Sequence, residues 1–277
     1  MIDVALDTYR QQIEQWRAER ERALAAPDGW LSLVGLYPLA DREYSIGSSD
    51  HSDIVLPASA PAHLGSLSFR NGEATLHVTA DVFVTVNEIE VRRVEMVDNY
   101  RGRQPTVVRV GTLSMNLHRF GSEVALRIRD NQSPTLREFG GCRWYPVQAK
   151  YRVQGQLLRR PVQAIAVTTS VKTQADYESV GEVVFELAGE SLTLLAAGTS
   201  KPDELFIIFR DATAGTTTYS AGRYLYTPVD ASGNVSLDFN KAYNPPCAFT
   251  PYATCSLPPA QNVLPVAVEA GELYPPL

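Results

Sequence analysis

The sequence predicts a mainly β protein with one N-terminal helix. After residue 29 the apolar residues occur in short or alternating runs, and turns that contain Gly or Asn separate these runs at the spacing of an antiparallel sandwich or barrel. No alternation of strands with long helical stretches is present, which argues against a parallel α/β fold. With 277 residues, the chain is long enough for one large domain or two smaller ones.

The first segment is predicted to form a helix from about Asp3 to Ala25. Tyr9, Ile13 and Trp16 follow one another at helical spacing, and the residues between them are charged or polar for the most part. Asp3 can cap the start, and a Pro-Asp-Gly turn ends the helix. We expect its apolar stripe to pack onto the body of the protein. A coiled-coil partner is the alternative, which the small number of heptads disfavours.

The remaining elements are predicted to be strands joined by hairpin turns. Each turn contains a glycine, which supplies the positive φ that tight hairpins require. The predicted turns contain Asn71-Gly72, Gly121-Ser122, Ala188-Gly189-Glu190, Asp211 to Gly215 and Ser232-Gly233-Asn234.

Polar residues and proline become more frequent around residues 101–105, so we place an approximate boundary between two β units there. The predicted organisation is an N-terminal helix (1–28), a small β-sandwich unit (29–104) and a larger antiparallel barrel or sandwich (105–277). From Tyr243 onward the tail has too many prolines for an interior strand and too many apolar residues for a disordered linker. We therefore expect an ordered strap, which covers either a pocket or only the core.

The charge and cysteine content restrict the partners and the compartment. The chain has 31 acidic and 25 basic residues, and this balance argues against nucleic acid or a membrane as the main partner. The three cysteines, Cys142, Cys247 and Cys255, are too few for a disulfide framework, and a reducing compartment fits them. No apolar stretch has the length of a signal peptide core or a membrane span, so the expected location is the cytoplasm.

The common signatures of catalysis and cofactor binding are missing from the sequence. The four histidines are scattered without H-x-x-x-H or H-E-x-x-H spacing, and there is no C-x-x-C pair, so no metal site is predicted. There is also no G-x-S-x-G elbow, P-loop or G-x-G-x-x-G motif. We predict no cofactor, and a hydrolase assembled from distant residues stays open.

The stretch YSIGSSDHSDIVLP (residues 44–57) and the strands after it resemble the opening strands of a forkhead-associated (FHA) domain. That resemblance implies a β-sandwich, and its phosphothreonine readers carry an arginine directly after the glycine and a Ser-x-x-His element downstream. Here Ser48 stands at the arginine position and Ala60 at the serine position, although His63 is present. The resemblance therefore implies the sandwich, and a protein-interaction module is one alternative for the function.

A second resemblance extends over most of the chain. The runs DGWLSLVGLYPL, IGSSDHSDIVLP, GCRWYPV, LFIIFRDATAGTTTYSAGRYLY and LDFNKAYNPPCAFTPYATCSLPPAQNVLPVAVEAGE resemble bacterial and archaeal proteins of the domain of unknown function 1684 (DUF1684) family. This resemblance implies no activity, substrate or catalytic residue. It points to the arm of residues 237–271 and to the hairpin of residues 210–226 as the stretches in which to look for a site.

Arginines, tyrosines and amides gather at the predicted strand ends in and near these stretches. Guanidinium groups bind carboxylates in a bidentate manner and rings supply apolar walls, so this composition favours a pocket for a small polar or anionic molecule. Arg143 beside Trp144 can hold a planar ligand, or else forms an aromatic corner over the core. The predicted ligand-binding residues are Arg210, Arg223, Asn240, Lys241, Tyr243, Asn244, Arg143 and Trp144.

The structural alternative for the same residues is an ion pair between Arg223 and either Asp211 or Asp238 that pins the tail across a barrel end. The chemical alternative is a hydrolase or isomerase in which one of these carboxylates is the acid or base, assisted by Tyr219 or Cys247. Cys247 follows two prolines and is either an activated nucleophile or an inert thiol. Binding of a small molecule is the first hypothesis; the ligand and the oligomeric state are left open.

Overall fold

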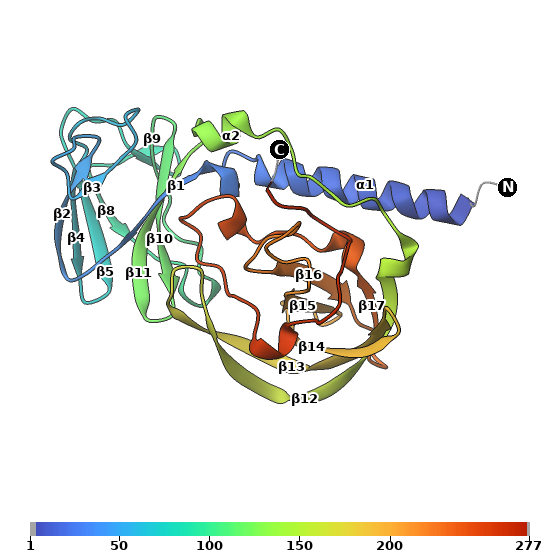
Figure 1. The fold of residues 1–277 in the computed structure, drawn as a ribbon. Helices are drawn as coiled ribbons and strands as arrows, with labels where there is room; N and C mark the ends of the chain where they lie inside the picture. The colour runs from blue at the N-terminus through green and yellow to red at the C-terminus, as the bar shows by residue number, and fades with distance from the viewer. Residues whose placement is uncertain (1–3, 276–277) are drawn as a thin grey trace. The chain divides into compact units, whose positions relative to one another are not determined.

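The computed structural model describes residues 4–275 and confirms a mainly β fold with a long N-terminal helix (Figure 1). Its internal contacts divide the chain into two units. One unit comprises residues 24–139, and the other combines residues 4–23 with 140–275. The boundary that we expect near residue 104 falls inside the first unit and stays a prediction. No helix in the described part of the chain is long and apolar enough to cross a membrane.

Residues 24–139 form a β-sandwich of two antiparallel sheets, apart from one parallel pair. The first sheet has the strand order β1-β11-β10-β9-β6-β7, and the second has the order β3-β2-β4-β5-β8. Alternate side chains of both sheets face one shared core, to which Leu67 and Leu76 contribute from the second sheet and Met115 and Leu126 from the first. The sandwich implied by the FHA resemblance is therefore confirmed.

The elements of this unit are, in chain order, η1 (Trp30–Ser32), β1 (Leu33–Pro38), β2 (Arg42–Gly47), β3 (Ile54–Val55), β4 (Gly65–Arg70), β5 (Glu73–Val78), β6 (Thr85–Val86), β7 (Ile89–Glu90), β8 (Arg93–Met96), η2 (Tyr100–Gly102), β9 (Val108–Val110), β10 (Leu113–Phe120), β11 (Glu123–Asp130) and α2 (Pro134–Glu138). The hairpin turns predicted from glycine positions join β4 to β5 and β10 to β11. Asn71 and Gly72 have φ values of 52° and 83°, as the first of these turns requires.

The second unit is a six-stranded antiparallel sheet that nearly closes into a barrel. Its strand order is β16-β15-β14-β13-β12-β17. The two end strands approach each other because Val229 pairs with Val235 and the Thr227 hydroxyl donates to the Ser236 carbonyl at 2.8 Å. The elements are α1 (Val4–Leu24), η3 (Ala149–Tyr151), β12 (Arg152–Thr168), β13 (Gln174–Leu187), β14 (Glu190–Gly198), β15 (Glu204–Phe209), β16 (Arg223–Pro228), β17 (Asn234–Asp238), η4 (Phe239–Lys241), η5 (Pro246–Ala248) and η6 (Ala260–Asn262).

Helix α1 packs onto this unit through the stripe that its spacing predicts. Ile13 is fully buried and Tyr9 is 9% exposed, while most of the residues between them are exposed. The helix begins at Val4 and ends at Leu24, close to the predicted limits. Asp3, the expected cap, lies outside the described residues. The predicted packing of the helix on the body of the protein is confirmed by these buried residues.

The C-terminal strap, which we define as residues 243–275, is ordered and crosses the barrel (Figure 1, orange to red). From Val263 to Ala270 exposed and buried residues alternate strictly, as in an extended segment with one face on a core. Leu264, Val266 and Val268 belong to the same apolar cluster as the barrel residues Ile207 and Leu225. This part of the strap therefore covers the barrel core.

Candidate functional site

The Arg223 guanidinium and the Asp211 carboxylate form a buried ion pair at 3.0 Å in which both side chains are 1% exposed. Arg223 follows the Gly222 turn that opens β16, and Asp211 follows the end of β15, so the hairpin brings them together. The other hydrogen bonds of Arg223 run to the strap, because its guanidinium donates to the carbonyls of Val268 and Ala270. Burial lowers the pKa of Arg223, and the Asp211 charge opposes this shift.

The second carboxylate oxygen of Asp211 also bonds to the strap. Its Oδ2 accepts from the Val268 N–H at 2.7 Å and from the Thr213 hydroxyl at 2.7 Å. The arrangement corresponds to the structural alternative for Arg223, with Asp211 as its partner and the strap pinned by both side chains.

Asp238 and Asn240 connect helix α1 to the barrel. Asp238 Oδ1 accepts a hydrogen bond from the Tyr9 hydroxyl at 2.8 Å, and Asn240, which is fully buried, donates to the same hydroxyl at 3.0 Å. Asn240 also exchanges hydrogen bonds with the backbone of Gln148 in both directions. Burial, followed by the Asp238 charge, raises the pKa of Tyr9, so its hydroxyl remains a donor. Both predicted residues thus hold the helix in place.

Asn244 belongs to a buried polar cluster with Glu272, a residue that no sequence motif marks. The Asn244 amide donates to Glu272 Oε1 at 3.1 Å, and its backbone N–H donates to Glu272 Oε2 at 3.0 Å. Arg20 of α1 donates to Glu272 Oε2 at 2.8 Å and lies 4.2 Å from the centroid of the Tyr243 ring. Burial and then Glu272 raise the pKa of the Cys142 thiol in this cluster. These contacts attach the strap to α1.

Arg143 and Trp144 are adjacent in sequence but point to different environments. Arg143 is exposed, whereas Trp144 is half-buried and donates from its indole nitrogen to Glu21 at 2.9 Å. The guanidinium of Arg17 lies 4.8 Å from the centroid of the Trp144 ring, and Trp16 meets that ring edge to face at 5.8 Å. The aromatic corner over the protein body is the arrangement observed at Trp144.

The remaining predicted site residues lie along the strap and its anchors. Arg210 is exposed, and its backbone pairs with the strap at Asn262 and Leu264. Lys241 is half-buried in η4. The Tyr219 hydroxyl donates to the Cys247 carbonyl at 3.0 Å, and burial raises its pKa above the usual range. The predicted residues therefore do not converge on a single site.

Two of the FHA-like phosphothreonine positions, Ser48 and Ala60, contact each other. The Ser48 hydroxyl, at the position of the missing arginine, donates to the Ala60 carbonyl at 2.8 Å. His63 is exposed. Among residues 4–275, no group of three or more His, Cys, Asp or Glu side chains is arranged to hold a metal ion.

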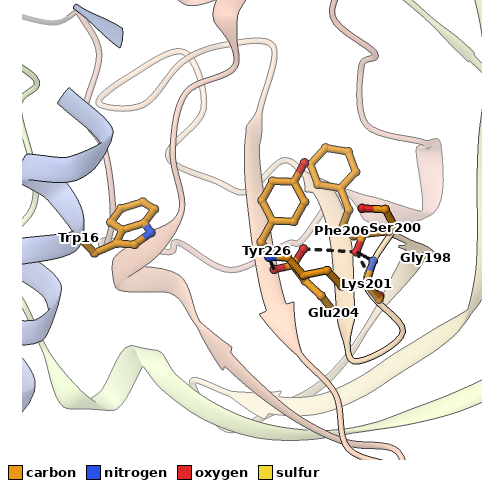
Figure 2. A pocket seen from close by; sticks show the side chains of 8 residues that line it. Trp16, Gly198, Ser200, Lys201, Glu204, Phe206 and Tyr226 are labelled. Atoms are coloured by element: carbon orange, nitrogen blue, oxygen red, sulfur yellow. Dashed lines mark hydrogen bonds and ion pairs between the residues drawn. The ribbon is translucent and has the colours of Figure 1, made fainter. Parts of the chain in front are cut away.

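A hollow of about 570 Å³ lies beside the strap in the barrel unit (Figure 2). Its aromatic residues are Trp16 of α1, Phe206 of β15 and Tyr226 of β16. Its polar side is the turn before β15, where Lys201 Nζ lies 3.1 Å from Glu204 Oε1 and the Thr199 hydroxyl donates to Glu204 Oε2 at 3.2 Å. Tyr226 is 47% exposed.

Tyr243 connects this hollow to the strap. Its backbone exchanges two hydrogen bonds with Tyr224, at 2.8 and 3.0 Å, and its ring lies nearly parallel to that of Tyr226, with the centroids 6.4 Å apart. Tyr243 is the predicted ligand-binding residue that approaches the lining of the hollow most directly. Because side chains alternate along a strand, Tyr224 and Tyr226 share one face of β16, but nothing in the sequence associates Trp16 or Lys201 with them.

Comparison with known proteins identifies relatives without an assigned activity. A family model described as "Protein of unknown function (DUF1684)" matches residues 137–273. The runs quoted above that begin at Gly141 or later lie inside this match, and the two earlier runs precede it. No curated protein matches the chain.

Two solved structures are similar to parts of the chain. One is the solution NMR structure of the uncharacterized protein from gene locus rrnAC0354 of Haloarcula marismortui, with 33% identity, coverage of 51% of this chain and 80% of that chain, and a TM-score of 0.43. The other is the FhaA FHA domain in a crystal structure of its complex with the intracellular domain of Rv3910, with 16% identity, coverage of 34% of this chain and 97% of that chain, and a TM-score of 0.24.

Proposed function

This chain belongs to the DUF1684 family, and since that family supplies no activity, we propose from the geometry of the chain itself that it binds a small polar molecule with an anionic group. The proposed site is the hollow beside the strap, lined by Trp16, Lys201, Glu204, Phe206 and Tyr226. The single observation that carries the proposal is that three aromatic side chains and a lysine line one hollow, with Trp16 standing apart from Phe206, Tyr226 and Lys201 (Figure 2).

The rings supply apolar contact area in a fixed arrangement. Phe206 and Tyr226 pack against each other with centroids 4.8 Å apart, and Tyr243 supports Tyr226 from the strap. Rings that are held by neighbours lose little conformational freedom when a ligand binds. A planar or apolar part of the ligand would lie against Tyr226, whose exposed ring area binding would remove from water.

The polar side supplies a cation and an acceptor. Lys201 is 66% exposed, so its ammonium group can exchange part of its contact with Glu204 for a carboxylate or phosphate of the ligand. Glu204 is 26% exposed and accepts a donor of the ligand. Burial, followed by the Glu204 charge, raises the pKa of Tyr226, so that its hydroxyl stays protonated and can donate. The proposed ligand therefore carries both an acidic group and a hydrogen-bond donor.

A hydrolase or isomerase with Asp211 or Asp238 as acid or base has less support. Asp211 is buried in an ion pair, and both carboxylates already accept hydrogen bonds from protein groups. Neither residue lines the hollow. The geometry therefore favours binding over turnover.

The test is a thermal-shift screen against small carboxylates, phosphates and nucleotides together with their uncharged analogues. Since a ligand at 100 times its Kd stabilises by about 2.7 kcal/mol, millimolar binders are detectable. Hits are then titrated by isothermal calorimetry against Lys201→Met and Tyr226→Ala. We expect each substitution to weaken binding by ~10-fold or more, which corresponds to ~1.4 kcal/mol.

Matched controls are Lys150→Met and Tyr252→Ala, which change an exposed lysine and a partly exposed tyrosine outside the hollow. These controls should bind with unchanged Kd. A ligand whose Kd is the same in the Lys201 and Tyr226 variants would place binding elsewhere and contradict the proposal. A panel without any hit would also count against it.

A further inference from the structure

Two of the three cysteines meet within the strap. Cys247 lies in η5, and Cys255 follows eight residues later. The backbone N–H of Cys247 donates to Cys255 Sγ at 3.2 Å. Because the N–Cα bond is about 1.46 Å long, Cys255 Sγ lies within about 4.7 Å of the Cys247 Cα. The sulfur of Cys255 is therefore held against the backbone of Cys247.

Both cysteines are held in position by the rest of the barrel unit. Ser170, in the turn between β12 and β13, accepts from the Cys255 N–H at 2.9 Å, and its own N–H donates to the Cys255 carbonyl at 2.8 Å. On the other side, the Tyr219 hydroxyl donates to the Cys247 carbonyl at 3.0 Å, and the Tyr224 hydroxyl donates to the Ser256 carbonyl at 3.0 Å. The backbone of the strap at both cysteines is thus fixed against the barrel.

The two thiols differ in exposure and in acidity. Cys247 is partly exposed, whereas Cys255 is 5% exposed. The hydrogen bond from Cys255, opposed by burial, lowers the pKa of Cys247 to about 7, while the same hydrogen bond and burial raise the pKa of Cys255. Thiol–disulfide exchange uses this arrangement, with a thiolate at the accessible position and a protonated thiol behind it.

We propose that Cys247 and Cys255 form a reversible thiol–disulfide couple that reacts with low-molecular-weight disulfides of the glutathione type. Cys247 attacks one sulfur of the disulfide; a protein–glutathione S–S bond forms, the reagent S–S bond breaks, and one glutathione thiolate leaves and takes a proton from solvent. Cys255 then loses its proton to solvent and attacks Cys247 Sγ, which expels the second glutathione thiolate. Two protein thiols are oxidised and one disulfide is reduced to two thiols.

The titratable groups that act on Cys247 are Cys255, Tyr219 and Tyr224. Burial raises the pKa of both tyrosines above the usual range, so they stay neutral around pH 7. The rate of the first step should therefore follow the ionisation of Cys247 and reach half of its maximum near pH 7.

The experiment uses the full chain, reduced and then exposed to oxidised glutathione for increasing times. Free thiols are trapped with N-ethylmaleimide after an acid quench and mapped by mass spectrometry. We expect residues 247 and 255 to become linked to each other while Cys142, which is 7% exposed, keeps its thiol. Cys247 should react ~10-fold or more faster than Cys142 at pH 7, and reduced glutathione should reverse the bond.

Two variants separate the steps. Cys255→Ser should accumulate one glutathione adduct on Cys247, because the resolving thiol is missing. Cys247→Ser should form neither the adduct nor the link, and Cys142→Ser should behave as the unmodified chain does. The proposal would be overturned by a lasting adduct on Cys247 of the unmodified chain without the internal link, by equal reactivity of Cys142, or by linkage only after unfolding in urea. These results are all measured on the unmodified chain, so they test the proposal even if a variant fails to fold.

Discussion

The carboxylate of Asp211 bridges two parts of the chain, since one oxygen lies 3.0 Å from the guanidinium of Arg223 while the other accepts from the backbone N–H of Val268 at 2.7 Å. The ion pair therefore attaches the strap to the barrel, because its carboxylate also accepts a hydrogen bond from the strap backbone. The Arg223 side chain is among the largest fully buried side chains in the described part of the chain.

Removing one partner of this pair should destabilise the barrel unit strongly. In Arg223→Met the Asp211 charge stays buried without its cation, and such a loss costs about 3–5 kcal/mol. Urea denaturation followed by tryptophan fluorescence measures the free energy of unfolding. The control is Arg10→Met, because Arg10 and Asp7 are exposed and their pair should contribute under ~1 kcal/mol. A loss below ~1 kcal/mol in Arg223→Met would contradict the anchoring role of the pair.

A side chain at Gly271, which follows the buried part of the strap, should lower the free energy of unfolding. Its φ is +80°, and an added Cβ would lie 2.4 Å from the Ala242 carbonyl oxygen. Gly189 has a similar φ of +81° in the β13–β14 turn, but nothing lies within 4 Å of an added Cβ. Gly189→Ala should therefore cost about 1–2 kcal/mol for the left-handed backbone alone.

For Gly271→Ala we expect ~2 kcal/mol beyond that amount, because the backbone of the strap or of η4 must move. The measurement is the difference in unfolding free energy between the two alanine variants. Equal losses in both would show that the strap can shift at little cost.

His118 should make the sandwich unit less stable in acid. Burial, followed by the charges of Arg127 and Arg129, lowers its pKa to about 4. An unfolded histidine has a pKa near ~6.5, so between pH 6.5 and 4 the unfolded chain binds more protons than the folded one. The free energy of unfolding should therefore be unaffected by this group above pH 6.5 and should fall as the pH drops toward 4.

The expected loss from His118 is about 1–2 kcal/mol after allowance for its partial exposure. It is measured as the difference in unfolding free energy between pH 7 and pH 4, compared with His118→Gln, in which this contribution is absent. His77→Gln changes an exposed histidine and is the control. An identical pH dependence in His118→Gln and the unmodified chain would refute the prediction.

The fragment of residues 24–139 should fold by itself. It is continuous in sequence, and both of its sheets share one apolar core. The shorter fragment of residues 29–104 lacks β9, β10 and β11, and with them core residues such as Met115 and Leu126. We expect a dispersed amide NMR spectrum and cooperative unfolding only from the longer fragment. A folded shorter fragment would instead support a domain boundary near residue 104.

Local chemistry in the sequence determined the elements of this protein. The spacing of Tyr9, Ile13 and Trp16 predicts helix α1, and the Asn71-Gly72 pair predicts the turn between β4 and β5. These features depend on the backbone preferences of residues close to one another in sequence. The proline content and the many apolar residues of the tail also predict an ordered strap before its location is known.

The partners of the polar residues were decided only by the tertiary structure. Arg223 pairs with Asp211, whereas Asp238 accepts a hydrogen bond from Tyr9, which is 229 residues away in the sequence. The same holds for Glu272, whose charge is buried because Arg20 and Asn244 surround it. The proposed ligand hollow likewise joins three segments distant in sequence. Many carboxylates and arginines have the same local backbone preferences, so the local sequence does not tell which of them pair. Long-range packing selects the pairs, because a charged group that becomes buried needs a partner.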